Sequence, residues 1–165
     1  MYGIIATWRM ALEGISKADS MLKNNESAAD SIEEAIKAVE DFEYYKSVGY
    51  GGLPNEEMEV ELDAAFMDGD TLEFGCVGGV KDFANPVSIA RSLMHYDANN
   101  FLAGQGAEKY ASRHGFERKT MLTDRAKIHY KNRIKEEQSK LQPYAGHDTV
   151  GMVCLDDSGK MTAAT

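Results

Sequence analysis

The octapeptide at residues 146–153, Gly-His-Asp-Thr-Val-Gly-Met-Val, places His147, Asp148 and Thr149 in consecutive positions. A threonine hydroxyl at its ordinary pKa is a weak nucleophile. Cleavage of the Asp148–Thr149 peptide bond would give Thr149 a free α-amine with a pKa of about 8, which is partly unprotonated at neutral pH and can act as a base. The alternative is a polar turn that enters a strand and has no chemical role. The residue types alone leave both interpretations open.

The hydrophobic pattern changes at this stretch. Residues 119–142 are charged and helix-like, whereas residues 150–155 form a near-continuous apolar run of strand length. This change predicts a strand that begins at Thr149 and forms a hairpin with residues 160–165. We therefore expect Thr149 at a helix-to-strand junction.

The rest of the chain predicts a mixed α and β protein. Apolar residues at helical spacing predict helices over residues 15–24, 28–42, 87–96 and 106–114. Ser27 is a predicted N-cap, and Pro86 is predicted at a first helical position. Short apolar or alternating runs predict a strand over residues 3–7 and an antiparallel hairpin over residues 59–68 and 72–77.

Three other residues could belong to a site or to the scaffold. Trp8 follows the first predicted strand, where a lone tryptophan is commonly a core anchor. Ser47 lies in the glycine-rich connection at residues 44–55, which matches neither a Walker nor a dinucleotide pattern and could be a flexible turn. Asp63 could be buried near a site or solvated on an alternating strand. The sequence pattern leaves these alternatives open.

Composition excludes several classes of function. The 165 residues contain 18 Lys and Arg against 27 Asp and Glu, and this formal charge of -9 argues against non-specific binding to nucleic acid or to an anionic membrane. Cys76 and Cys154 lack metal-ligand spacing, which predicts reduced core residues. Because neither a transmembrane run nor a signal peptide is evident, we expect a cytoplasmic protein.

The octapeptide resembles the processing site of glycosylasparaginases. These enzymes belong to the asparaginase type 2 family of N-terminal nucleophile hydrolases, which also includes plant-type asparaginases and isoaspartyl peptidases. Further blocks resemble the family in the same order, and they lie at residues 6–8, 47–55, 62–69 and 75–80. The resemblance therefore spans nearly the whole chain.

The resemblance implies an α+β fold, the αββα sandwich of these hydrolases, of which this chain holds an incomplete part. Residues 1–148 would be the α-subunit region, with residues 119–145 as a variable charged linker before the cleavage site. Residues 149–165 would begin the β subunit. Family members continue further, supplying an arginine, an aspartate and a Thr-Gly oxyanion hole. We therefore expect the isolated chain to have little or no activity, and its last strand to be an exposed edge.

The resemblance also implies the chemistry. Thr149 would cleave its own peptide bond by an N-to-O acyl shift, assisted by His147 and Asp148, and would then hydrolyse the side-chain amide of an asparagine derivative without a metal or organic cofactor. Trp8 would line the substrate pocket, Ser47 would hold the threonine amine, and Thr165 falls near a second family threonine.

The implied substrates are glycosylasparagine, asparagine or an isoaspartyl dipeptide. The implied partners are the remainder of the β subunit and a second αβ unit. The alternative is a non-enzymatic fragment that acts as an interaction module.

Overall fold

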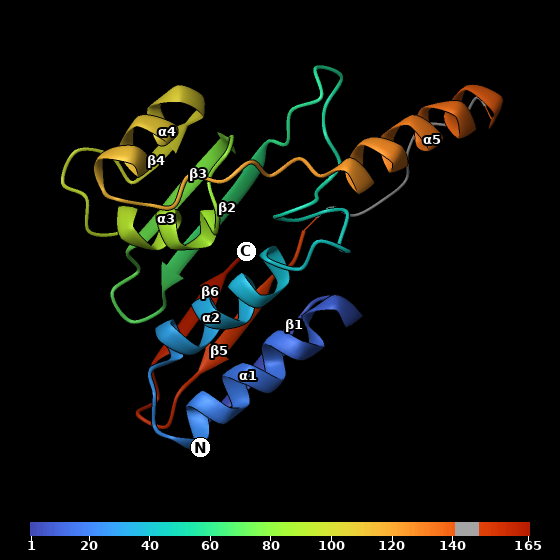
Figure 1. The fold of residues 1–165 in the computed structure, drawn as a ribbon. Coiled ribbons are helices and arrows are strands. Elements are labelled where there is room, and N and C mark those ends of the chain that lie inside the picture. The colour runs from blue at the N-terminus through green and yellow to red at the C-terminus, as the bar shows by residue number, and fades with distance from the viewer. Residues whose placement is uncertain (141–148) are drawn as a thin grey trace.

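The computed structural model describes residues 1–140 and 149–165, which form one mixed sheet with helices packed against it (Figure 1). The strands are β1 (Gly3–Ala6), β2 (Leu62–Asp68), β3 (Phe74–Val80), β4 (Phe101–Ala103), β5 (Met152–Leu155) and β6 (Met161–Ala164). Their order across the sheet is β1-β5-β6-β2-β3-β4, and the β3–β4 pair is parallel whereas the other pairs are antiparallel.

The helices follow from local signals in the sequence. They are α1 (Leu12–Lys23), α2 (Ala28–Glu40), α3 (Pro86–Leu93), α4 (Gly104–Arg113) and α5 (Asp124–Lys140), and a 3₁₀ turn at Arg9–Ala11 precedes α1. Ser27 caps α2, because its hydroxyl oxygen accepts a hydrogen bond from the Asp30 N–H at 3.0 Å. Pro86 begins α3, where a missing N–H costs nothing. Both predicted helix starts are confirmed.

One face of the sheet is covered by helices. Helices α1 and α2 lie over β1, β5 and β6, and α3 lies over β2 and β3 (Figure 1). Helix α1 approaches α2 closely at Gly14, where a Cβ atom would lie 2.3 Å from the Ala35 carbonyl oxygen. The side chains between helices and sheet, such as Phe66 and Ile36, are fully buried. This layer is the core of the described chain.

The opposite face of the sheet is apolar and open. Cross-strand neighbours on this face form a continuous row across β1, β5, β6, β2 and β3, consisting of Ile5, Val153, Ala163, Met67 and Phe74. Ile5 is 71% exposed and Phe74 is 44% exposed. The predicted α+β class is confirmed, and within the described residues it consists of a single sheet with one helix-covered face.

The prediction that the last strand is an unpaired edge is wrong. Strand β6 lies inside the sheet, because it pairs with β5 on one side and with β2 on the other. The edges of the sheet are β1 and β4. The predicted start of β5 is also early, since Thr149 lies three residues before the strand begins at Met152.

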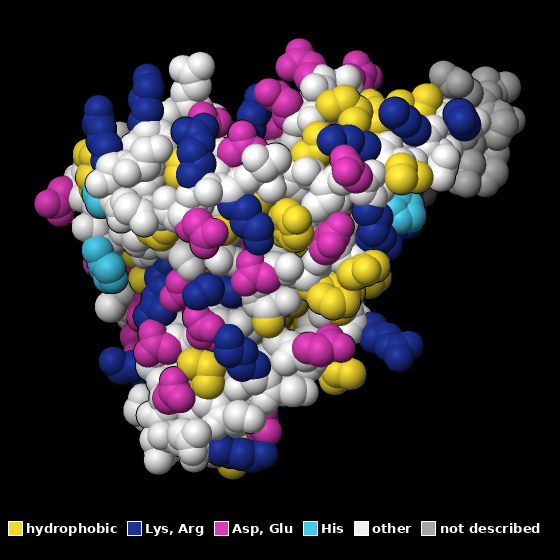
Figure 2. All heavy atoms as spheres, in the orientation of Figure 1, with side chains coloured by type: hydrophobic (Ala, Val, Ile, Leu, Met, Phe, Trp, Pro, Cys, Tyr) yellow, Lys and Arg dark blue, Asp and Glu magenta, His cyan; other side chains and the backbone are white. Residues whose placement is uncertain are grey.

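Charged residues dominate the helix side and the projecting α5. Figure 2 views the helix-covered side, where acidic and basic side chains are interspersed, as is typical of a solvated surface. Helix α5 extends away from the sheet (Figure 1), and its Ile128 is 60% exposed. Its first turn is fixed by Arg125, whose guanidinium lies 4.4 Å from the centre of the Tyr44 ring. No helix among the described residues combines the length and apolar character needed to cross a bilayer.

Candidate active site

A pair of threonine hydroxyls lies at the centre of the candidate site. The Oγ1 atoms of Thr149 and Thr165 are 2.8 Å apart, and the Thr165 hydroxyl donates to the Val150 carbonyl oxygen at 2.8 Å. Because a hydroxyl has a single proton, Thr165 has none left for Thr149. The Thr149 hydroxyl therefore donates to Thr165. This contact fixes the direction of the Thr149 O–H bond and leaves the Thr149 oxygen lone pairs directed elsewhere.

Neighbouring strands hold this pair in place. Thr165 exchanges both backbone hydrogen bonds with Ala65 of β2, at 2.9 Å each. Gly151 is held from the other side by Thr7, whose backbone N–H donates to the Gly151 carbonyl oxygen at 2.9 Å. The Thr7 hydroxyl oxygen in turn accepts from the Gly151 N–H at 2.9 Å. The segment that carries Thr149 is thus anchored to the sheet on both sides.

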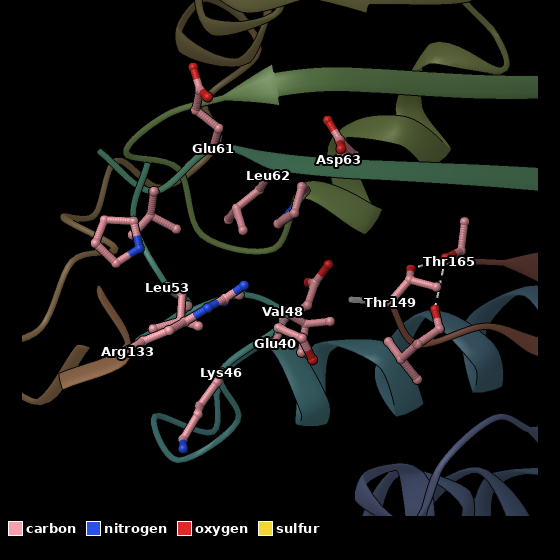
Figure 3. Close-up of a pocket in the computed structure, with 17 residues that line it drawn as sticks. Glu40, Lys46, Val48, Leu53, Glu61, Leu62, Asp63, Arg133, Thr149 and Thr165 are labelled. Carbon is pink, nitrogen blue, oxygen red and sulfur yellow. Dashed lines mark hydrogen bonds between the residues drawn. The ribbon is translucent and has the colours of Figure 1, made fainter. Parts of the chain in front are cut away.

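The hydroxyl pair faces a pocket of about 400 Å³ (Figure 3). The walls come from the end of α2, the glycine-rich loop, the start of β2, helix α5 and the β5–β6 region. The charged and hydroxyl-bearing residues among its lining are Glu40, Lys46, Ser47, Glu61, Asp63, Arg133, Thr149 and Thr165. The structure therefore brings Ser47, Thr149 and Thr165, which are far apart in sequence, to one pocket.

The glycine-rich loop is a fixed wall of this pocket. Gly49 has φ +58°, and a Cβ atom there would lie 2.1 Å from the Glu40 carbonyl oxygen. That same oxygen accepts a hydrogen bond from the Tyr50 N–H at 2.7 Å, and the Gly51 N–H donates to the Met121 carbonyl oxygen at 2.9 Å. These contacts exclude a flexible turn and hold the loop against the end of α2.

Glu40 is a buried carboxyl group that the sequence patterns did not single out. It is 4% exposed, and its two carboxylate oxygens accept hydrogen bonds from the Val87 N–H and the Asn85 side-chain amide, both at 3.2 Å. Burial raises the pKa of Glu40 to about 7, because desolvation outweighs these two hydrogen bonds. The sequence signal that could have identified Glu40 as buried is its position four residues after Ile36, on the apolar face of α2.

The other predicted site residues lie in different surroundings. Trp8 has φ 66° and ψ 148°, and its side chain is 52% exposed, so it is not a core anchor. It is also not among the residues that line the pocket with Thr149. Asp63 is exposed at the pocket rim, where its Oδ1 accepts from the Gly79 N–H at 2.8 Å. His147 and Asp148 lie outside the described residues. Within residues 1–140 and 149–165, no cluster of three or more His, Cys, Asp or Glu side chains is arranged to hold a metal ion.

Comparison with known proteins shows the family to which the chain belongs. The profile of the family described as Asparaginase matches residues 6–165. The chain belongs to the asparaginase family. This membership confirms the family that the sequence motifs indicated.

Relatives within the asparaginase family carry different names. The chain is 33% identical to the N(4)-(β-N-acetylglucosaminyl)-L-asparaginase of Elizabethkingia miricola, covering 98% of this chain and 47% of that protein. It is 36% identical to the isoaspartyl peptidase/L-asparaginase of Rattus norvegicus, covering 93% of this chain and 48% of that protein. It is 32% identical to the isoaspartyl peptidase of Escherichia coli, and the match covers 92% of this chain and 50% of that protein. The chain thus spans about half the length of these relatives.

Proposed function

We propose that this protein is an amidohydrolase that cleaves the side-chain amide of an asparagine derivative, with Thr149 as its nucleophile. The observation that carries the proposal is the oriented Thr149–Thr165 hydroxyl pair at the mouth of a pocket. No basic side chain among the described residues hydrogen bonds with the Thr149 hydroxyl. A base is nevertheless needed, and an α-amine on Thr149 itself would supply one.

That amine would come from self-cleavage between Asp148 and Thr149. In this step the Thr149 Oγ attacks the Asp148 carbonyl carbon, the C–N bond breaks, and the nitrogen takes up the hydroxyl proton to become an amine. Water then hydrolyses the resulting ester and releases the new α-carboxylate of Asp148. Thr165 would contribute by holding the Thr149 hydroxyl in one orientation throughout.

Catalysis would repeat this chemistry on a substrate. The Thr149 amine accepts the Oγ proton, Oγ attacks the side-chain amide carbon, and the departing amine takes the proton with it. Water hydrolyses the aspartyl ester and releases aspartate. Ser47 shares the pocket with Thr149 and would help to hold the amine. Trp8 follows β1, the strand that pairs with β5, and it would contact the substrate.

The remainder of the protein would complete the site. The open apolar face of the sheet, which includes Ile5 and Phe74, fits a second sheet laid against it, and the relatives' greater length supplies enough chain for one. An oxyanion hole contributed by that part would account for a rate factor on the order of 10² or more. We therefore propose that residues 1–165 alone have little or no activity. An interaction module without catalysis is the second candidate, favoured by the same open face.

Intact mass spectrometry tests the proposal. The chain and its Thr149→Ala variant are purified and incubated, both as residues 1–165 and in the full-length protein. A fragment that ends at Asp148, present only when Thr149 is intact, supports the proposed nucleophile. If the full-length protein neither cleaves itself nor releases aspartate from asparagine derivatives, the hydrolase proposal is wrong and the interaction module remains.

A further inference from the structure

Strand β1 pairs with β5 only as far as Ala6, which lies opposite Met152. Continued by one position, the same register places Thr7 opposite Gly151. The chain then leaves the sheet, because Trp8 has φ 66° and ψ 148° and a 3₁₀ turn follows it. Thr7 thus marks the end of this pairing.

The pair of Thr7 and Gly151 departs from a regular antiparallel ladder at one bond. Two residues in a hydrogen-bonded pair normally exchange both backbone N–H···O bonds. The Thr7 N–H donates to the Gly151 carbonyl oxygen at 2.9 Å, as in a ladder. The Gly151 N–H, however, donates to the Thr7 hydroxyl oxygen at 2.9 Å, and this hydroxyl points back to the Gly151 carbonyl oxygen at 3.4 Å. A side-chain oxygen thus takes the place of the Thr7 carbonyl oxygen.

This hydroxyl lies close to the site in the chain but outside the hydrophobic core. The Thr7 side chain is exposed, so its loss removes little buried surface. Its partner Gly151 lies two residues from Thr149. The residue between them, Val150, accepts the Thr165 hydroxyl at its carbonyl oxygen, at 2.8 Å. Residues 149–151 are therefore held by two threonine hydroxyls, one from the β6 side and one from the β1 side.

We propose that Thr7 is a positioning residue for the nucleophile, whose hydroxyl holds residues 149–151 in place once Asp148 has been cut away. This inference rests on the proposed hydrolase function. In the precursor, the peptide bond to Asp148 restrains Thr149 from its N-terminal side. After self-cleavage Thr149 is a chain end, and chain ends are poorly ordered unless they are tied down. A displacement of about 1 Å at a reacting group can cost about 10²-fold in rate. Thr7 acts through Gly151 and takes no part in the bond changes.

The test compares three variants of the full-length protein. Thr7→Val keeps the shape of the side chain but removes the hydroxyl, whereas Thr7→Ser keeps the hydroxyl. Thr71→Val is the matched control, because Thr71 is also exposed and its hydroxyl oxygen also accepts a backbone N–H, that of Glu73 at 3.3 Å in the β2–β3 turn. Intact mass against time gives the rate of self-cleavage. Aspartate release from asparagine and from N4-acetylglucosaminyl-asparagine, normalised to the cleaved protein, gives kcat and KM, and thermal unfolding by circular dichroism gives the stability.

Thr7→Val is expected to lower kcat by about 10- to 100-fold and to leave KM within about 3-fold, because the lost hydrogen bond lets the nucleophile move while the substrate contacts remain. Its self-cleavage should slow by no more than about 3-fold, since Thr149 is then still joined to Asp148. Its midpoint of thermal unfolding should fall by no more than about 4 °C. Thr7→Ser and Thr71→Val should match the wild-type kcat within about 3-fold.

A wild-type kcat in Thr7→Val overturns the inference. A Thr7→Ser variant that is as slow as Thr7→Val also overturns it, because the hydroxyl would then not be the group that acts. Equal losses in self-cleavage and in kcat, or a larger fall in the unfolding midpoint, overturn it as well, because Thr7 would then support the fold as a whole. If the wild type neither cleaves itself nor releases aspartate from either substrate, the proposed function itself is wrong.

Discussion

Replacing Glu40 by glutamine should make the protein more stable at neutral pH. Glu40 is buried, and its carboxylate lies at the start of α3, where it accepts hydrogen bonds from Val87 and Asn85. Its pKa is raised by burial from 4.5 to about 7. Glutamine has nearly the same shape as the protonated carboxyl group and cannot ionise. The substitution therefore isolates the cost of a buried negative charge.

The sign and size follow from proton linkage. Between pH 4.5 and about 7 the native Glu40 holds a proton that the unfolded chain has released, so wild-type stability falls as the pH rises through this window. The pKa difference of about 2.5 units corresponds to about 3 kcal/mol, reached above pH 7, at about 1.4 kcal/mol per pH unit. The Gln variant is expected to match the wild type near pH 4.5 and to exceed its stability by up to that amount at pH 8.

Urea unfolding followed by circular dichroism measures this difference. Wild type, Glu40→Gln and the exposed control Glu26→Gln are unfolded at intervals from pH 4.5 to 8, and the free energy of unfolding is compared at each pH. A stability difference between wild type and Glu40→Gln that stays constant across this range would refute the reasoning. A variant that is less stable at pH 8 would show that the two hydrogen bonds to the carboxylate outweigh its desolvation.

Three further predictions concern the site and the open face. Thr165→Val should slow self-cleavage of the full-length protein by up to about 30-fold, because it removes two hydrogen bonds of about 1 kcal/mol each, while Thr165→Ser should retain the rate. Intact mass against time measures both rates. Gly49→Ala should lower the free energy of unfolding in urea by about 2–4 kcal/mol, because the residue has φ +58° and its new Cβ would meet the Glu40 carbonyl oxygen. An unfolding midpoint equal to that of the wild type would contradict the interpretation that the loop is fixed. Met67→Lys should reduce self-association of residues 1–165 in light scattering and change stability by no more than about 0.5 kcal/mol, because Met67 is 38% exposed on the open sheet face.

Local patterns were sufficient for most of the elements. Ser27 and Pro86 mark helix starts because capping and the missing proline N–H act within one turn of chain. Strand β4 was missed, since its three residues are too few to show a period and it is defined by its parallel partner β3. The octapeptide around Thr149 indicated the family without any structure, because it is a contiguous motif.

The site itself was assembled by tertiary structure. That β6 lies inside the sheet could not be read from the sequence, since strand order depends on pairing with the distant β2. This pairing is what brings Thr165 to Thr149. Burial of Glu40 likewise arises from α3 and the glycine-rich loop closing over the end of α2. The sequence by itself determined the nucleophile candidate and the elements that surround it, because those signals are local. Only the tertiary structure decided which hydroxyl, carboxylate and cation share its pocket, because those contacts join residues that are distant in the chain.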